Sequence, residues 1–138
     1  MTRRERGSMS IFTVVFSVVV FLLAGMLVDG GSAINARLRA ADIAEQGARA
    51  GADRVDIEYL RSSGQTRLLG QDQVCAKAIE VVHAYGEDGV KAGSCQVEQN
   101  QTAVTVEVSV HWDAFFLGAF GFPGSDMTSK ATAGPDAR

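Results

Sequence analysis

Few side chains in this sequence have the types that perform chemistry. The candidates are two histidines, His83 and His111, and two cysteines, Cys75 and Cys95. His111 and Asp113 could form a general base and its orienting carboxylate, but no residue pattern supplies a nucleophile or an oxyanion site. The sequence also lacks G-x-S-x-G, a phosphate-binding glycine loop and H-E-x-x-H. We therefore expect no enzyme and no cofactor, with His111 and Asp113 as ordinary polar residues on one strand face.

A zinc site would have to combine Cys75, His83, Cys95 and His111. Zinc sites usually contain ligand pairs about two to four residues apart, and no pair here has that spacing. We therefore expect no metal. The two cysteines then form either one disulfide or two unpaired thiols, and the compartment in which they lie decides between these alternatives.

The compartment is indicated by the run from Gly7 to Val28, which contains no charged residue. A helix rises about 1.5 Å per residue, so about 20 apolar residues cross the hydrocarbon core of a bilayer. A chain of 138 residues is too small to bury such a helix on every side. We predict a basic leader at residues 1–8 and a transmembrane helix at residues 9–28.

Charge predicts the orientation of that helix. Arg3, Arg4 and Arg6 precede the apolar run, whereas the first cation beyond it is Arg37. The positive-inside rule therefore places the N-terminus in the cytoplasm and the rest outside. Removing the leader's three arginines and one glutamate from the 13 basic and 16 acidic residues leaves residues 29–138 with 10 and 15. An acidic exported domain argues against nucleic-acid partners.

A cleaved secretory signal is the main alternative. Gly31-Ser32-Ala33 satisfies the small-residue cleavage pattern, but the apolar run exceeds the usual core of about 7–15 residues, which favours retention. Arg3-Arg4 is only a weak twin-arginine signal because Glu5-Arg6 follows it. In an exported domain an even cysteine count favours one disulfide, Cys75–Cys95, closing a loop of about 20 residues and contributing about 3 kcal/mol.

Residues 29–62 are predicted to continue the helix beyond the membrane. No proline occurs from Ser32 to about Leu60, and strong helix formers dominate. Gly30-Gly31 is the expected hinge, because each glycine lowers helix propensity by about 1 kcal/mol. Helical spacing predicts one apolar stripe that faces a partner. Its members are Ile34, Leu38, Ala41, Ala48, Ala52 and Val55.

Small residues form a second ridge on the same helix, at Ala40, Ala44, Gly47 and Gly51. The G-x-x-x-G spacing of its glycines lets another backbone approach closely. The ridge could pack on the protein's own domain or form a helix contact between subunits.

Residues 63–138 are predicted to form a small α+β extracytoplasmic domain. Helical spacing favours a second helix over Gln71–Tyr85. Strand patterns follow at Ser94–Glu98, Thr102–Val110 and Asp126–Ala133, of which the second alternates valines with polar residues. The fold class is therefore α+β, with one long N-terminal helix, a short second helix and a three-stranded, mainly antiparallel sheet.

The link Ala114–Phe122 holds four of the seven phenylalanines. As core it would cap the sheet. If exposed, it would mark a subunit contact or a contact with the membrane surface.

The order of motifs resembles a known family. Glu5-Arg6-Gly7-Ser8, the apolar span, Val28-Asp29-Gly30-Gly31 and an alanine-rich helix with several arginines at residues 36–52 are similar to the start of TadE/TadG-like proteins of tight-adherence (Flp-type) pilus systems. The resemblance covers about residues 4–52, and the later domain fits loosely. The alanine and arginine bias resembles versions from high-GC bacteria, actinobacteria in particular.

The resemblance implies a pilin-like, single-pass protein of the bacterial cytoplasmic membrane that assembles or anchors a pilus without enzymatic activity. Its partners would be the lipid bilayer and other pilus or envelope-assembly proteins, with self-association through the long helix. In the pseudopilin branch a prepilin peptidase cuts after a leader glycine, here between Gly7 and Ser8. That branch carries a glutamate soon after the cut, which Ser10–Thr13 lacks, and this favours an uncleaved anchor. A processed minor pilin, and an anchored or secreted binding domain unrelated to pili, stay open.

Overall fold

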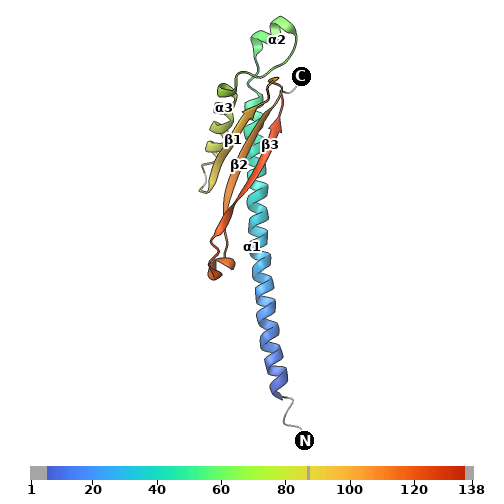
Figure 1. Ribbon diagram of the computed structural model, residues 1–138, viewed down its shortest axis with the longest axis vertical. Helices are drawn as coiled ribbons and strands as arrows, with labels where there is room; N and C mark the ends of the chain where they lie inside the picture. The colour runs from blue at the N-terminus through green and yellow to red at the C-terminus, as the bar shows by residue number, and fades with distance from the viewer. Residues whose placement is uncertain (1–5, 87, 136–138) are drawn as a thin grey trace.

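The computed structural model describes residues 6–86 and 88–135, with side chains from Met9 onward. One helix, α1 (Arg6–Ala52), forms the long axis of the molecule, and all other elements gather around its C-terminal half (Figure 1). They are α2 (Ile57–Ser63), α3 (Gln71–Ala84), β1 (Val90–Val97), β2 (Val104–Asp113), the 3-10 turn η1 (Leu117–Phe120) and β3 (Gly124–Ala133). The predicted α+β class is confirmed.

The helix α1 passes through Gly30 and Gly31 without a break, so the predicted hinge is wrong. A Cβ added at either glycine would meet nothing within 4 Å, so close packing does not explain why glycine occupies these positions. Asp29, directly before them, is hydrogen-bonded to the domain, and Ala33 and Ala36 after them pack on the core. Contacts on both sides therefore hold this stretch helical despite its low intrinsic propensity.

The helix ends at Ala52, and not at about Leu60 as the composition predicts. Asp56 starts a separate helix: its carboxylate accepts a hydrogen bond from the N–H of Tyr59 at 3.0 Å and two from the guanidinium of Arg67 at 2.7 and 3.0 Å. Val55 meanwhile pairs with Leu68 in an isolated antiparallel bridge. The capping aspartate and this bridge outweigh helix propensity here. They bind the N–H of Tyr59 and pair the backbone of Val55 with that of Leu68, and in a continuous helix these groups would bond within the helix instead.

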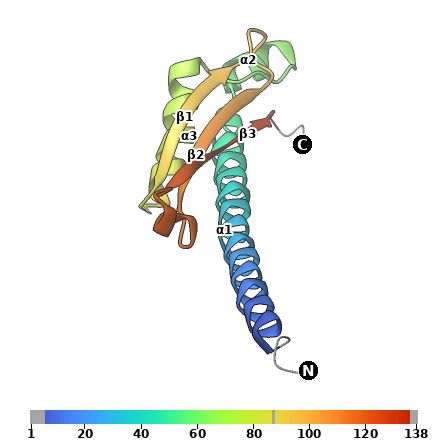
Figure 2. The same cartoon turned by 60° about the horizontal axis from the view of Figure 1, so that its bottom comes forward.

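The three strands form one antiparallel sheet in the order β1-β2-β3. On β2, Val104, Val106, Val108 and Val110 are buried, while the alternate residues face outward, as the alternation predicts. All ten residues of β2 pair in register with β3, and the β1–β2 pairing contains one irregularity between Ala92 and Cys95. The buried face of the sheet lies across α1, and α3 packs on the same helix beside β1 (Figure 2).

The core is built from small residues on α1 and larger ones around it. The buried face of α1 consists of Ala36, Ala40, Ile43, Ala44, Gly47, Ala48, Gly51 and Ala52. Ile34 and Leu38, in the first half of the predicted stripe, are each 64% exposed and do not pack on the protein's own domain. The sheet already supplies branched valines, and alanine or glycine opposite them lets helix and sheet approach to close-packed distance.

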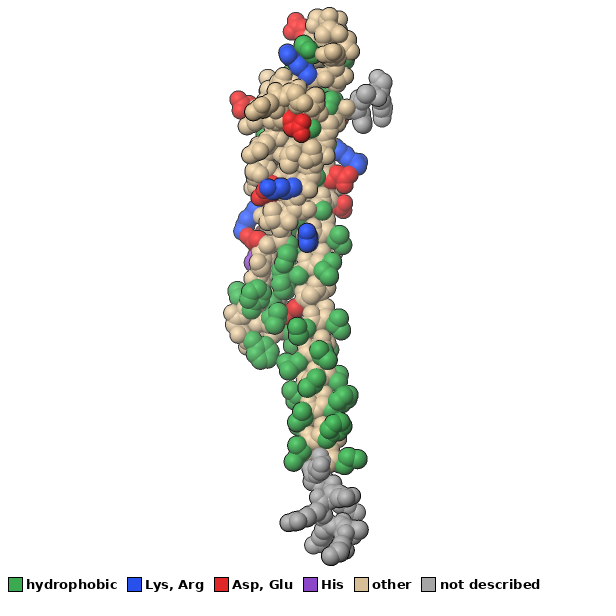
Figure 3. All heavy atoms as spheres, turned by 45° about the vertical axis from the view of Figure 1, so that its right-hand side comes forward, with side chains coloured by type: hydrophobic (Ala, Val, Ile, Leu, Met, Phe, Trp, Pro, Cys, Tyr) green, Lys and Arg blue, Asp and Glu red, His purple; other side chains and the backbone are tan. Residues whose placement is uncertain are grey.

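Most of the N-terminal half of α1 projects away from the domain, and Gly25 near its end is buried against Phe116. Among the described residues, α1 is the one helix long and apolar enough to cross a membrane, and 6% of its most apolar 18-residue stretch is buried. Hydrophobic side chains cover this half and continue onto the adjacent end of the domain (Figure 3). That junction positions the candidate site.

Candidate functional site

The predicted site residues lie in three separate places. Arg3 and Arg4 lie outside the described residues, and Arg6, Gly7 and Ser8 form the beginning of α1. Cys75 on α3 and Cys95 on β1 form a disulfide with a Cα–Cα distance of 5.8 Å, which ties α3 to the sheet. The disulfide reading of the two cysteines therefore holds, and the unpaired-thiol alternative does not.

The small-residue ridge faces the protein's own domain. Ala40 and Ala44 are fully buried, a Cβ on Gly47 would lie 3.1 Å from Val82, and one on Gly51 would lie 3.2 Å from Val74. The glycines thus admit α3 to close contact with α1. The ridge is occupied within the chain and is not free for a second subunit.

The most unusual contact in the structure ties the domain to α1 through Asp29. This side chain is 1% exposed, and it is the charged residue in the buried set of the described chain. Its Oδ1 accepts hydrogen bonds from the N–H groups of Phe115 and Phe116 at 2.9 and 3.1 Å, and its Oδ2 accepts one from Leu117 at 2.7 Å. One carboxylate therefore holds three consecutive amides of the β2–β3 link, which is how a buried charge is stabilised.

We call residues 114–123 the phenylalanine loop. The N–H of Ala114 bonds to the carbonyl of Pro123, and that of Phe122 to the carbonyl of Leu117, so the loop closes on itself. The 3-10 turn η1 ends at Gly121, whose φ of 93° favours glycine. A second glycine, Gly124, has a φ of 119°, and a Cβ there would collide with the carbonyl of Trp112. This backbone presents the loop toward α1.

The loop meets α1 at Gly25. A Cβ at this position would overlap the ring of Phe116, so only glycine leaves room for the ring to lie on the helix. An apolar groove of about 270 Å³ lies between them, lined by Leu22, Met26, Phe116, Leu117 and Phe120. The other side of the loop is open, since Phe115 is 80% and Phe120 73% exposed. Of the two alternatives left open for this link, Phe115 and Phe120 fit the exposed patch, whereas Phe116 packs on the helix at Gly25.

The outer face of the sheet carries charges. Asp126 on β3 contacts Nδ1 of His111 on β2 at 2.6 Å and Nζ of Lys91 on β1 at 3.0 Å. The hydrogen bond from His111, followed by that from Lys91, holds the pKa of Asp126 below its usual value. Glu107 is hydrogen-bonded by Lys130 and Ser94, and these bonds likewise lower its pKa. The arrangement links three strands across a solvent-facing surface.

His111 and Asp113 do share one strand end, with Nε2 of His111 3.6 Å from the Asp113 carboxylate. His111 is bonded instead to Asp126, and Asp113 is 94% exposed at its side chain. Within residues 6–86 and 88–135 no group of three or more histidine, cysteine or acidic side chains could hold a metal ion.

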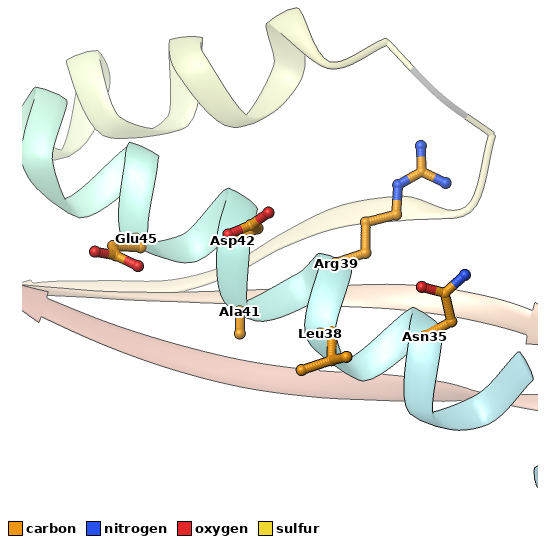
Figure 4. Close-up of a pocket in the computed structure, with 6 residues that line it drawn as sticks. All are labelled: Asn35, Leu38, Arg39, Ala41, Asp42 and Glu45. Atoms are coloured by element: carbon orange, nitrogen blue, oxygen red, sulfur yellow. The ribbon is translucent and has the colours of Figure 1, made fainter. Parts of the chain in front are cut away.

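A shallow hollow lies on the middle of α1, bordered by Asn35, Leu38, Arg39, Ala41, Asp42 and Glu45. Figure 4 shows these side chains leaving the helix in different directions, with Leu38 and Ala41 on one side and Asn35 and Arg39 on the other. They do not converge on a common point. The hollow is therefore a surface depression with mixed polarity and not a reaction site.

Sequence reasoning missed the role of Asp29. The sequence pattern places it in the motif Val28-Asp29-Gly30-Gly31 and predicts no contact for it. The available signal was its position, one charged residue at the end of an uncharged helical run, where a carboxylate needs nearby donors. Which donors it finds could not be read from the sequence, because they lie 86 to 88 residues away.

The fold and site describe an elongated α+β protein with one protruding apolar helix. Residues 7–54 match the model of the Flp pilus-assembly TadE/G-like family, which is similar to this chain over α1 and the turn that follows it. No curated protein and no solved structure matches the chain. The matched family and the candidate membrane helix together fit a membrane protein associated with pili.

Proposed function

We propose that the protein is a single-pass membrane protein that acts as a non-enzymatic assembly or anchoring component of a tight-adherence (Flp-type) pilus or a related envelope secretion system. One observation carries this proposal: the family match at residues 7–54 coincides with α1, both its exposed apolar half and the half that bears the core. Its partners are the lipid bilayer and other pilus or envelope-assembly proteins, without nucleic acid.

In this proposal residues 9–28 cross the bacterial cytoplasmic membrane, residues 1–8 lie in the cytoplasm, and residues 29–138 lie outside. Arg3, Arg4 and Arg6 support this orientation by the positive-inside rule. The Cys75–Cys95 disulfide supports an oxidising compartment for the domain. Alkaline phosphatase fused to the C-terminus should be active, and a reporter that requires the cytoplasm should be silent at the same point. The reverse pattern contradicts the orientation.

The assembly role is tested by deletion and complementation. A strain without this protein should lose surface pili by electron microscopy, and the wild-type gene should restore them. As a matched pair, the double variant Ala40→Leu/Ala44→Leu disrupts the core and should fail to restore pili, whereas Gln46→Leu on the exposed side of α1 should succeed. Normal piliation in the deletion strain contradicts the assembly role.

A processed minor pilin is the second candidate, and the uninterrupted α1 favours it. A helix that is apolar in its first half and carries a small sheet on its second half is suited to stacking in a filament. Ser10–Thr13 lacks the glutamate expected of processed pseudopilins, so we expect no cut between Gly7 and Ser8. Mass spectrometry of the mature protein decides: an intact leader supports the anchor, and Ser8 at the N-terminus supports the pilin.

Self-association through α1 would need a different face from the small-residue ridge, because that ridge is filled by α3 and the sheet. The exposed apolar residues Ile34 and Leu38 offer the remaining surface outside the proposed span. Substituting both with glutamine should dissociate an oligomer in detergent while leaving the unfolding temperature unchanged.

A further inference from the structure

The phenylalanine loop lies beside the part of α1 that the proposed function places in the bilayer. Phe116 covers Gly25, and the groove next to it is lined by Leu22 and Met26. At about 1.5 Å per residue, these two groove residues lie about 9 and 3 Å before Val28 along the helix. The loop is therefore level with the last turns of the apolar segment.

The composition of the loop is that of a membrane-contacting segment. Residues 114–123 contain no charged side chain. Phe115 and Phe120 expose most of their surface. Hydrophobic side chains of α1 continue onto the adjacent end of the domain (Figure 3). Isolated apolar residues are common on protein surfaces. An uncharged aromatic patch beside an apolar helix instead marks a surface that contacts a membrane or another protein.

Most backbone N–H groups of the loop have hydrogen-bond partners within the protein, as a segment in contact with hydrocarbon requires. An unpaired N–H group is costly in hydrocarbon, so a loop can enter it only if its donors are satisfied within the protein. Asp29 accepts from three consecutive amides, and bonds inside the loop serve others. The donors with protein partners are the N–H groups of Ala114, Phe115, Phe116, Leu117, Ala119, Gly121 and Phe122.

Charged residues begin immediately beyond the loop. Asp113 precedes the loop with an exposed carboxylate, and the paired residues His111 on β2 and Asp126 on β3 lie farther along the two strands from the loop. These groups favour water or headgroups and set a limit to how deep the loop can go. Interfacial segments typically bury their apolar face about 5–10 Å into the boundary between headgroups and acyl chains, which agrees with the level of the loop on α1.

We propose that the phenylalanine loop is a second membrane contact: Phe115 and Phe120 insert among the acyl chains of the leaflet at the Val28 end of α1. This inference rests on the proposed membrane span of α1. The occupant is lipid and not another subunit, because the groove is lined by apolar residues only and opens beside the uncharged half of the helix. With Asp29 tying the loop to α1, the second contact fixes the angle at which the sheet stands on the membrane.

The test uses tryptophan fluorescence of the full-length protein in phosphatidylcholine vesicles. Trp112 is replaced by phenylalanine first; its buried Nε1 has no hydrogen-bond partner among the described residues, so the change loses no such bond. Three probes are then compared: Phe120→Trp in the loop, Phe12→Trp in the proposed span, and Ile57→Trp in α2 at the far end of the molecule (Figure 1). Quenchers are lipids brominated either near the headgroup or near the chain end.

We expect Phe120→Trp to lose most of its emission to lipids brominated near the headgroup and less to those brominated near the chain end. Ile57→Trp should be unaffected, and Phe12→Trp should be quenched most by the deep lipids. An unquenched Phe120→Trp beside a quenched Phe12→Trp overturns the loop contact and leaves the span intact. Unquenched emission at both positions overturns the span and the loop contact together. A blue-shifted but unquenched Phe120→Trp shows a protein partner on the loop, which also overturns the lipid proposal.

Discussion

The carboxylate Oδ2 of Asp29 accepts a hydrogen bond from the backbone N–H of Leu117 at 2.7 Å, joining the middle of α1 to the β2–β3 link across 88 residues of sequence. With the bonds from Phe115 and Phe116, this contact fixes where the sheet ends against the helix. The domain is thereby attached to α1 at two places. One is the small-residue face between Ala36 and Ala52, and the other is Asp29.

Replacing Asp29 should release the phenylalanine loop. Asp29→Leu removes both acceptor oxygens and with them all three hydrogen bonds, whereas Asp29→Asn keeps one neutral acceptor oxygen, so the leucine variant should be affected more. Hydrogen exchange at Phe115, Phe116 and Leu117 measures the effect and should approach the rate of unprotected amides in Asp29→Leu. Asp113→Asn, next to the loop but exposed, is the matched control. Unchanged exchange in Asp29→Leu would show that the loop is held by packing alone.

Adding a methyl group at Gly25 should push the ring of Phe116 off the helix. The added Cβ overlaps the ring, and overpacking of this kind typically costs about 1–3 kcal/mol. Denaturant unfolding in detergent measures the loss for Gly25→Ala. Gly30→Ala is the control, because its Cβ meets no atom within 4 Å. Adding Phe116→Ala to Gly25→Ala should remove most of the penalty of the glycine change, and strict additivity of the two would contradict the contact.

A leucine at Gly51 should destabilise the monomer. The first added carbon would lie 3.2 Å from Val74 Cγ1 and 3.3 Å from its carbonyl oxygen, so the larger side chain must displace α3. We expect a loss of about 1–3 kcal/mol in the free energy of unfolding. Gln46→Leu on the exposed side of the helix should have little effect. If Gly51→Leu changed only the oligomeric state, measured by light scattering, the ridge would be a subunit contact instead.

Removing the disulfide should lower the free energy of unfolding by about 3 kcal/mol, the value expected for a closed loop of this size. The two cysteines are 20 residues apart in sequence, and the bond joins α3 to β1. Denaturant unfolding of the double variant Cys75→Ala/Cys95→Ala measures the loss. A reductant should weaken the wild-type protein by a similar amount and leave the double variant unchanged. Equal sensitivity of both proteins to the reductant would point to a different target.

The link between Asp126, His111 and Lys91 should make stability depend on acid pH. The pKa of Asp126 is lowered from 3.8 by its hydrogen bonds, so the folded state favours the charged form. This stabilisation is present above pH 3.8 and is lost as the pH falls below that value through the folded pKa. Asp126→Asn should therefore be less stable than wild type at neutral pH, and the two proteins should converge in acid.

Thermal unfolding across this pH range measures that convergence. Asp88→Asn, an exposed aspartate in the turn before β1, should parallel the wild-type curve. A constant difference between wild type and Asp126→Asn at all pH values would assign the effect of the substitution to packing.

The sequence determined the elements whose signals are local. The uncharged run from Gly7 to Val28 specifies an apolar helix by composition, and the valine alternation of Thr102–Val110 specifies one buried strand face by its period of two. The helix predicted at Gln71–Tyr85, observed as α3, and the three strands along the chain follow from similar local patterns. Even the correct cysteine pair required only the count and the expected compartment.

Tertiary structure decided which surfaces those elements use. The face of α1 that packs is the alanine and glycine ridge and not the stripe with Ile34 and Leu38, because close approach to a valine-rich sheet requires small side chains. In the β2–β3 link, Phe115 and Phe120 turn outward while Phe116 packs on α1, and Asp29, far away in sequence, holds the link there by accepting hydrogen bonds from three of its amides. Helical and strand periods predict that a face exists, but its partner depends on contacts between residues distant in the chain, and these form only when the whole domain folds.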